Sequence, residues 1–461
     1  MVTYQDLLAV GDSDEARMDF VLKVINAHKA SEKYEIAKIA DEYARHQNRT
    51  IMQYQKLLYT ISGKAVPDNF SANYKIPSNF FYRFVTQENQ FLLGNGVTFE
   101  NSDTKDRLGD DFDTQVQKAG LNALIGSAAF GFYNLDHVEV FTFLEFAPML
   151  DEENGALSAG VRFWQIDPIK PLRATLYELD GYTEYIWRDG KGSILKPKRA
   201  YKINVRTSEA DGLEIFDGEN YPTFPIVPLY ANPYKQSELV GLREQIDAYD
   251  LIRSGFCNDL DDVSQIFWTI SNAGGMDDID LAQFIQRMKT VKAAAVEDGE
   301  QIQAHSFDIP YNAREVLLDR LRKDMYRDFM AIDTDEIANG AVTATQIKAA
   351  YEPLNAKADQ FEYCVIEFID GILAAAGIDD TPTFTRSYII NQTEMIQNLI
   401  TAGEYLDQEY VTEKILSILG DADKTEEMLA RLADEEIERA NMQREVYQEA
   451  AEQGQETLEG E

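Results

Sequence analysis

The sequence predicts an α+β protein, mainly helical, with a mixed β-sheet region and two long helices joined by a small α/β insert. Three observations carry this prediction. Apolar residues recur at helical spacing over 237–267 and again over 312–330, and aromatic and β-branched residues dominate 128–230. Strands gathered in one part of a chain, with helices before and after them, are typical of the α+β class.

The helical pattern over 237–267 has two different faces. Its apolar residues fall three or four apart, from Leu239 to Phe267, and therefore form one stripe. An unbroken helix over this segment would run roughly 45 Å, longer than a typical globular helix. The opposite face carries the carboxylates of Glu244, Asp247, Asp250, Asp259, Asp261 and Asp262. A long helix with one acidic face is typical of a strut that packs beside copies of itself.

A compact insert and a second long helix follow. Residues 277–289 predict a short helix, and 290–296 with 301–309 predict a β-pair. The helix over 312–330 is apolar on one side, while its other faces mix both signs of charge. These charges are expected either to be solvated and paired within their own helix, or to face the acidic helix of a neighbouring copy. The basic residues of most interest are Arg320, Lys323 and Arg327.

The first part of the chain predicts helices followed by strands. Helices are expected over 14–62, 74–94 and 113–127, with a polar linker at 62–72 and a short strand at 97–99. The mixed sheet is expected to begin near residue 128. Its strands are predicted at 130–135, 138–143, 159–165, 174–179, 183–187 and 201–205.

An acidic, glycine-containing loop over 331–342 interrupts the helical pattern after the second long helix. Thr343 can cap the next helix, which is predicted to run to about Ala376. Pro353 lies inside this helix and predicts a kink.

The last part of the chain predicts small elements and an acidic end. A strand is expected at 383–389, and two short helices over 393–419 are separated at Gly403. The tail over 421–461 holds 14 acidic and 4 basic residues, a net charge of −10. Its composition favours helix over 425–452, and its final residues have the composition of a disordered end.

The net charge of the chain limits its partners. With 80 acidic and 43 basic residues it carries −37 at neutral pH. This excludes a conventional nucleic-acid binder, whose affinity comes from lysine and arginine neutralising phosphates. A channel through which DNA slides is different, because negative walls repel the phosphates and limit sticking.

The sequence contains no motif for catalysis, metal binding or membrane insertion. Cys257 and Cys364 occupy apolar helical positions, as buried free thiols do, and the four histidines are scattered without zinc-ligand spacing. No P-loop, GxSxG motif, signal peptide or run of about 18 apolar residues is present. We therefore predict no catalytic residue, no metal ion, no cofactor and no membrane span.

Four segments in order resemble the family of phage portal proteins from long-tailed siphophages of Gram-positive hosts. The resemblance covers roughly residues 20–420, and order and spacing match across it. The segments are KIPSNFFYRFVTQENQFLLGNGVTF (75–99), FPIVPLYAN (224–232), EQIDAYDLIRSGFCNDLDD (244–262) and VTATQIKAAYEPLNAKADQF (342–361).

The resemblance implies a portal fold and a ring of usually twelve subunits at one capsid vertex of the virion, assembled in the host cytoplasm. Such a ring passes double-stranded DNA without sequence readout during packaging and ejection. Its other partners are the terminase, the scaffold and major capsid protein, and then a head-completion adaptor or tail protein. The implied parts are a wing over 1–236, a first stem helix over 237–268, a clip over 269–310, a second stem helix over 311–330, a tunnel loop over 331–342, the rest of the wing over 343–392, and a crown with an acidic tail over 393–461.

Two sets of residues follow as candidate functional residues. The tunnel loop would ring the narrowest point of the channel with Asp333, Thr334, Asp335, Glu336, Asn339 and Gly340. Stem contacts between subunits would set Asp247, Asp250, Asp259, Asp261 and Asp262 against Arg320, Lys323 and Arg327 of a neighbouring copy.

Two other classes of protein stay open at this point. A different virion structural protein, such as a baseplate or adaptor component, would lack the helix–insert–helix hairpin followed by an interrupted helix. A hydrolase built on the sheet would need a nucleophile or ligand motif, and none is visible in the sequence.

Overall fold

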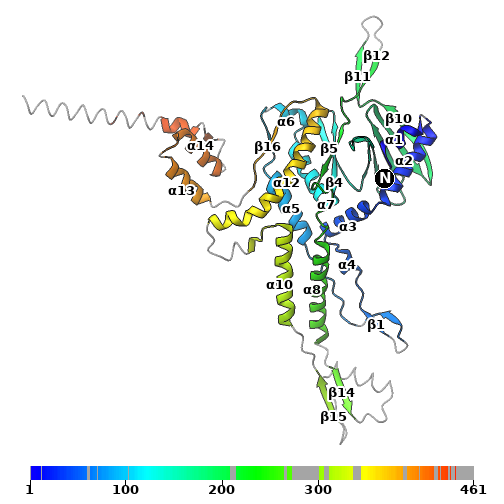
Figure 1. Cartoon of the computed structure of the whole chain (residues 1–461), viewed down its shortest axis with the longest axis vertical. Helices are drawn as coiled ribbons and strands as arrows, with labels where there is room; N and C mark the ends of the chain where they lie inside the picture. The colour runs from blue at the N-terminus through cyan, green and yellow to red at the C-terminus, as the bar shows by residue number, and fades with distance from the viewer. Residues whose placement is uncertain are drawn as a thin grey trace, which may run out of the picture. The chain divides into compact units, whose positions relative to one another are not determined.

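The protein, seen in a computed structural model, forms two compact units, Met1–Ser387 and Tyr388–Glu461, and each is described by itself. The described residues are 2–11, 13–59, 63–69, 71–101, 103–207, 214–263, 267–271, 301–305, 311–335, 344–387, 392–403, 405–419, 424–425, 427–433, 437 and 442. Helices and strands are both abundant in them, which confirms the predicted α+β class (Figure 1).

Four helices open the chain, and hydroxyl caps explain where three of them begin. The side chains of Thr3, Ser13 and Ser31 each accept a hydrogen bond from a backbone N–H three residues later, satisfying a donor that the helix leaves unpaired. The helical prediction over 14–62 is confirmed only as far as residue 53. The helices are α1 (Tyr4–Val10), α2 (Asp14–Lys29), α3 (Glu32–Ala44) and α4 (Arg49–Gln53).

A five-stranded sheet in the order β10-β9-β8-β7-β6 follows later in the chain, and every pairing in it is antiparallel. Two-residue turns join β8 to β9 and β9 to β10; the one after β9 contains Asp189 and Gly190, both with positive φ. Because every described pairing in this sheet is antiparallel, the prediction of a mixed sheet is wrong here. Helix α2 packs its apolar side against this sheet. The strands are β6 (Phe146–Leu150), β7 (Leu157–Trp164), β8 (Leu172–Glu178), β9 (Gly181–Arg188) and β10 (Lys191–Arg199).

A separate three-stranded antiparallel sheet, in the order β13-β4-β5, lies in the main hydrophobic core. Helix α7 (Phe112–Gly126) and the long helix α12 (Ala344–Ala376) both pack against it, and α5 (Phe80–Leu93) packs against α7. Two glycines permit the close approach of α12. A Cβ on Gly131 would lie 2.5 Å from the Phe368 ring, and one on Gly371 would lie 2.5 Å from Val227. The strands are β4 (Ala128–Asn134), β5 (His137–Thr142) and β13 (Ile226–Tyr230).

Two long helices form an antiparallel hairpin, drawn side by side in Figure 1: α8 (Arg243–Val263) and α10 (Tyr311–Phe329). The helix predicted over 312–330 is confirmed. The helix predicted over 237–267 is shorter, because the segment before Arg243 forms turns and Phe267 belongs to a strand.

That strand, β14 (Phe267–Ser271), pairs with β15 (Gln301–His305), a pairing that the sequence did not predict. The predicted helix at 277–289 and strand at 290–296 lie outside the described residues.

Several elements, most of them short, were missed by the sequence prediction or only partly predicted. Strands β1 (Leu57–Tyr59) and β2 (Ala65–Pro67) form a hairpin that includes part of the predicted linker. Helix α6 (Asp103–Leu108), strands β6, β10 and β13, and the pair β11 (Lys202–Thr207) and β12 (Glu214–Glu219) were only partly expected.

The predicted long helix continues through Pro353, as α12, and ends before Gly377, which has φ 65°. The strand predicted at 383–389 is β16 (Pro382–Phe384), which pairs with β3 (Val97–Phe99). The second unit contains α13 (Gln392–Ala402) and α14 (Gln408–Leu419), on either side of Gly403 as predicted.

Candidate functional site

The α8–α10 hairpin is rooted in the core at one end. Phe329 and Tyr326, near the end of α10, are buried against the α5 ring of Phe84, each with a centroid separation of 4.9 Å. Asp328 accepts a hydrogen bond from Gln245 (2.6 Å) at this rooted end. Toward the other end of the hairpin, exposed apolar side chains appear on both helices: Leu260, Tyr311, Val316 and Leu317.

An extended segment, residues 74–78, is held along α8 by alternate backbone N–H groups. Four residues of helix rise about 6.0 Å and two residues of extended chain advance about 6.6 Å, so the two spacings match. We call these contacts the polar ladder. Its hydrogen bonds run from Tyr74 N–H to Asn258 Oδ1 (2.6 Å), from Ile76 N–H to Ser254 Oγ (3.0 Å), and from Ser78 N–H to Asp250 Oδ1 (2.8 Å).

Asp250 is fully buried within this ladder. Its carboxylate also accepts a hydrogen bond from the Asn48 side-chain amide. Burial raises the pKa of Asp250, while the hydrogen bonds from Asn48 and Ser78 act in the opposite direction. The predicted role of Asp250 on an acidic face toward a neighbouring copy is therefore wrong, because no second chain can reach the carboxylate.

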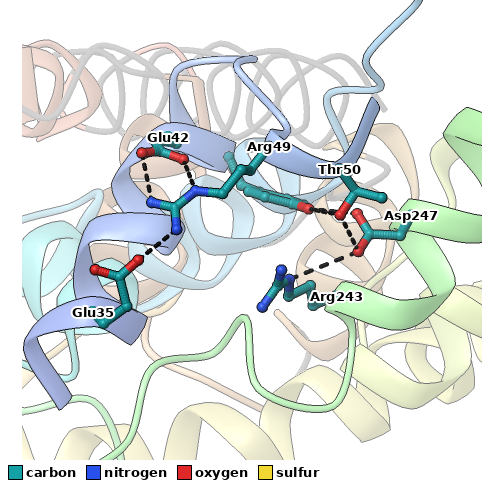
Figure 2. A network of polar contacts seen from close by, with 7 residues as sticks. Glu35, Glu42, Arg49, Thr50, Arg243 and Asp247 are labelled. Atoms are coloured by element: carbon teal, nitrogen blue, oxygen red, sulfur yellow. Dashed lines mark hydrogen bonds and ion pairs between the residues drawn. The ribbon is translucent and has the colours of Figure 1, made fainter. Parts of the chain in front are cut away.

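Asp247 is likewise engaged within its own chain (Figure 2). It accepts hydrogen bonds from the hydroxyls of Tyr43 and Thr50, the latter at 2.7 Å, and pairs with Arg243 at 3.7 Å. Its side chain is only partly exposed, so its predicted contact with a neighbouring copy stays a prediction. Beside it, Arg49 donates two hydrogen bonds of 2.7 Å to Glu42 and another to Glu35, which raises the pKa of its guanidinium.

The remaining predicted stem residues lie at more accessible positions. Asp259 pairs with Arg314 (2.6 Å) and so joins α8 to α10 of the same chain. Asp261 is exposed, and the side chain of Asp262 lies outside the described atoms. The three basic residues of α10 are exposed and form ion pairs along their own helix: Arg320 and Arg327 with Asp324, and Lys323 with Asp319.

The start of the predicted tunnel loop is folded against the core. Ile332 is buried, and its backbone exchanges hydrogen bonds with the Gln87 side chain (2.9 and 3.1 Å). The carboxylate of Asp333 is buried and accepts a hydrogen bond from Arg322 (2.6 Å). The expectation that the whole loop projects into solvent is therefore wrong for these two residues.

Thr334 and Asp335 are exposed, as the prediction for this loop requires. Glu336, Asn339 and Gly340 lie outside the described residues. Within the described part of the loop, Asp335 can therefore present its carboxylate to solvent, whereas Asp333 cannot.

A charged junction ties four helical segments together at the root of the hairpin. Lys357 of α12 pairs with Glu238 (2.6 Å), just before α8, and with Glu88 of α5 (3.3 Å). The same ammonium donates to the Phe329 carbonyl at the end of α10 and lies 3.2 Å from the centroid of that ring. Burial raises the pKa of Glu88 to about 8, which favours the protonated form of this carboxyl at neutral pH.

Sequence reasoning missed Ser254, Asn258, Glu88 and Lys357. One local signal existed for the first two: Asp250, Ser254 and Asn258 repeat every four residues, which marks a polar stripe distinct from the exposed acidic residues. No local signal identifies Glu88 or Lys357, because their partners lie far away in sequence.

The described residues hold no catalytic arrangement that we can identify. A cavity of about 220 Å³ lies beside α2, and the ring of His28 in its lining is hydrogen-bonded to the Phe143 carbonyl (2.8 Å). The hydroxyl of Ser31, also in the lining, caps α3. Within the described part of the chain, no three His, Cys, Asp or Glu side chains are grouped closely enough to hold a metal ion. None of the described helices is both long and apolar enough to cross a membrane.

Comparison with known proteins agrees with the resemblance seen in the sequence. The sequence profile of the family described as "Phage portal protein, SPP1 Gp6-like" matches residues 22–442. The portal protein of Clostridium phage phiCD119 is 25% identical over 358 residues, covering 70% of this chain and 77% of that protein. The portal protein of Bacillus phage SPP1 is 22% identical over 424 residues, covering 85% of this chain and 82% of that protein.

Two solved structures are also similar at 11% sequence identity. One is from the neck of an empty gene transfer agent particle, with a TM-score of 0.42 over 74% of this chain and 90% of that chain. The other is from the virion of a native gene transfer agent particle, with a TM-score of 0.40 over 74% of this chain and 89% of that chain.

Proposed function

This chain belongs to the SPP1 Gp6-like family of phage portal proteins, a structural family, and on that premise we propose that its copies form the ring at one capsid vertex. Double-stranded DNA would pass through the axial channel during packaging and ejection. The terminase would dock first, and head-completion and tail proteins afterwards. The ring would hold twelve copies, contact the scaffold and major capsid protein, assemble in the host cytoplasm and remain in the virion.

The observation that carries this proposal is the α8–α10 hairpin. It is rooted in the core through Phe329 and the junction of Lys357, Glu238 and Glu88. A hairpin held this firmly can act as a rigid strut, so copies standing side by side would surround a channel. The net charge of −37 supports the same function, since negative walls do not trap phosphates.

The parts of the portal fold are assigned on the same basis. Helices α8 and α10 would be the two stem helices, with the clip between them over 269–310 and the tunnel loop over 331–342. The wing would comprise residues 1–236 and 343–392, and the crown and tail residues 393–461.

The mass of the purified assembly tests the ring directly. Light scattering should give the mass of a closed multimer, and negative-stain microscopy should show a ring with a central hole. Monomers alone, at high concentration and in virions, would refute the ring. A multimer without an axial hole would instead favour another virion structural protein, such as a baseplate or adaptor component.

Charge reversal in the tunnel loop tests the DNA channel. Asp335→Lys with Glu336→Lys should leave ring assembly intact and reduce the DNA packaged per procapsid, because each subunit then offers cations to phosphate. The defect should ease as salt rises. Glu153→Lys with Asp379→Lys is the matched control, since both residues are exposed in the first unit and the charge change is equal.

Normal packaging by well-formed mutant rings at low salt would reject the channel role of this loop. Loss of rings in the loop variant, with the control intact, would show that the loop is a subunit contact.

A further inference from the structure

Helix α8 is the middle layer of three. One of its sides faces α10, through Gln245 and Asp259. The side that faces the polar ladder, through Asp250, Ser254 and Asn258, is centred about 160° around the helix axis from it, although the neighbours Asn258 and Asp259 are only about 100° apart. We call residues 54–79, between α4 and α5, the arm. Figure 1 draws α10, α8 and the β1 part of the arm in this order.

The two outer layers both expose apolar side chains. On α10, Val316 is 69% exposed and lies about 200° around the helix from Arg314, the residue that faces α8. On the arm, Tyr54, Leu57 and Tyr74 are exposed, Tyr74 by 53%. Apolar side chains on both edges of one subunit are what a head-to-tail contact between identical copies requires.

We infer that the α10 edge of one copy packs against the arm edge of the next, with Val316 against Tyr74. This inference rests on the proposed ring. This contact joins two different surfaces of the same chain. It is therefore heterologous, and repetition of such a contact closes a ring when the rotation between copies permits. It also replaces the predicted contact with the acidic side of α8, since in each copy the chain's own arm covers Asp250.

Val316 and Tyr74 lie at similar heights along the hairpin. Arg314 pairs with Asp259, and Tyr74 bonds to the adjacent Asn258, so both lie level with the same turn of α8. Val316 is two residues beyond Arg314, or about 3 Å along α10. Copies related by rotation about an axis parallel to the hairpin keep their heights, so Val316 comes level with the next copy's Tyr74.

The charges at the rooted end are complementary. Arg327 is exposed on the same outer side of α10 as Val316, near the level of Gln245. Glu35 is half-exposed beside Arg49, near the level of Asp247. A side-by-side arrangement thus brings a cation of one copy toward a carboxylate of the next.

The polar ladder makes the arm suitable as an interface. Asn258 both accepts from the Tyr74 N–H and donates to its carbonyl (3.3 Å), so the backbone is held while the ring stays exposed. An aromatic side chain on a fixed backbone loses little further conformational freedom on binding.

Disulfide trapping in the full chain tests the contact. The variant with Val316→Cys and Tyr74→Cys, oxidised with copper and air, should give a ladder of covalent multimers on a non-reducing gel. Within one chain the side chain of Val316 is exposed on the side of α10 that points away from α8, so we expect no bond to position 74 of the same chain. The control variant combines Val316→Cys with Leu135→Cys, since Leu135 is an exposed residue of the β4–β5 turn. It should give no more covalent multimers than the wild type, whose free cysteines are Cys257 and Cys364.

Single substitutions give a second measurement. Val316→Asp should raise the protein concentration needed for half-assembly by at least about tenfold, with an unchanged melting temperature of the free subunit. Leu135→Asp should leave assembly unchanged.

The outcomes separate this inference from the proposed function. Wild-type rings without covalent multimers, and rings that tolerate Val316→Asp, would overturn the contact while leaving the ring. A wild-type chain that never assembles would instead refute the proposed ring.

Discussion

Buried carboxylates are the residues whose roles depend most on their surroundings. Asp250 and Glu88 are both buried, and burial raises the pKa of each. Asp250 keeps hydrogen-bond donors around it, whereas Glu88 lies beside one ammonium that is shared with Glu238. The two side chains should therefore respond differently to substitution.

Removing the Asp250 carboxylate should destabilise the first unit. Asp250→Ala leaves the buried Ser78 N–H and the Asn48 amide without this acceptor, at a cost of about 1–3 kcal/mol for each donor. Glu244→Ala, an exposed residue on the same helix, should change the free energy of unfolding by less than about 0.5 kcal/mol. Denaturant unfolding measures both, and equal effects would contradict the role of the ladder.

Glu88 should make stability depend on pH in a defined direction. Its pKa rises from 4.5 to about 8 on folding, so the folded chain binds the proton more tightly. The contribution of Glu88 protonation to the free energy of unfolding is complete below pH 4.5, and it is lost as the pH rises through about 8. Glu88→Gln, which cannot titrate, should lose less melting temperature than the wild type between pH 5 and 9. Glu153→Gln is an exposed control, and parallel curves for all three proteins would exclude this titration.

The polar ladder is the main feature at the scale of elements. It fastens an extended segment to a helix by matching two periods, four residues of α8 to two residues of the arm. The helix thereby takes the place of a neighbouring strand as hydrogen-bond acceptor, and α8 becomes fixed on two sides.

Hydrogen exchange should report the ladder residue by residue. The amides of Tyr74 and Ile76 should exchange slowly although they lie outside any strand, and Lys75 between them should exchange faster because its N–H points the other way. Asn258→Ala should release Tyr74 first. Uniform exchange across 74–76 in the wild type would show that the segment is not held.

The whole molecule consists of two units, and the described core belongs to the first. The three hydrophobic clusters contain only residues up to Phe384. The strand pair β16–β3 closes this unit near its end. The second unit is described through α13 and α14.

A chain that ends at Ser387 should therefore fold on its own. Its melting temperature should match that of the main transition of the full chain, because the described core contacts are retained. Calorimetry of both proteins measures this. A large drop would mean that residues 388–461 contribute to the core of the first unit, and a chain ending after Glu452 would show whether the last nine residues matter.

The amino-acid sequence by itself determined the kinds of elements and the family. Helical spacing is local, so it located α10, α12 and the two helices on either side of Gly403 to within a few residues. Four segments in order identified the portal family, which the profile over residues 22–442 confirms.

Only the tertiary structure decided which side chains meet. Asp247 and Asp250 looked like members of one exposed acidic face, yet they are bound by Tyr43, Thr50 and Ser78, about 170 to 200 residues away. Asp333 looked like a free channel carboxylate but is neutralised by Arg322. The spacing of apolar and polar residues indicates on which side of a helix a residue lies. It does not indicate which other segment covers that side. Burial and pairing depend on contacts between distant segments, and those exist only once the chain has folded.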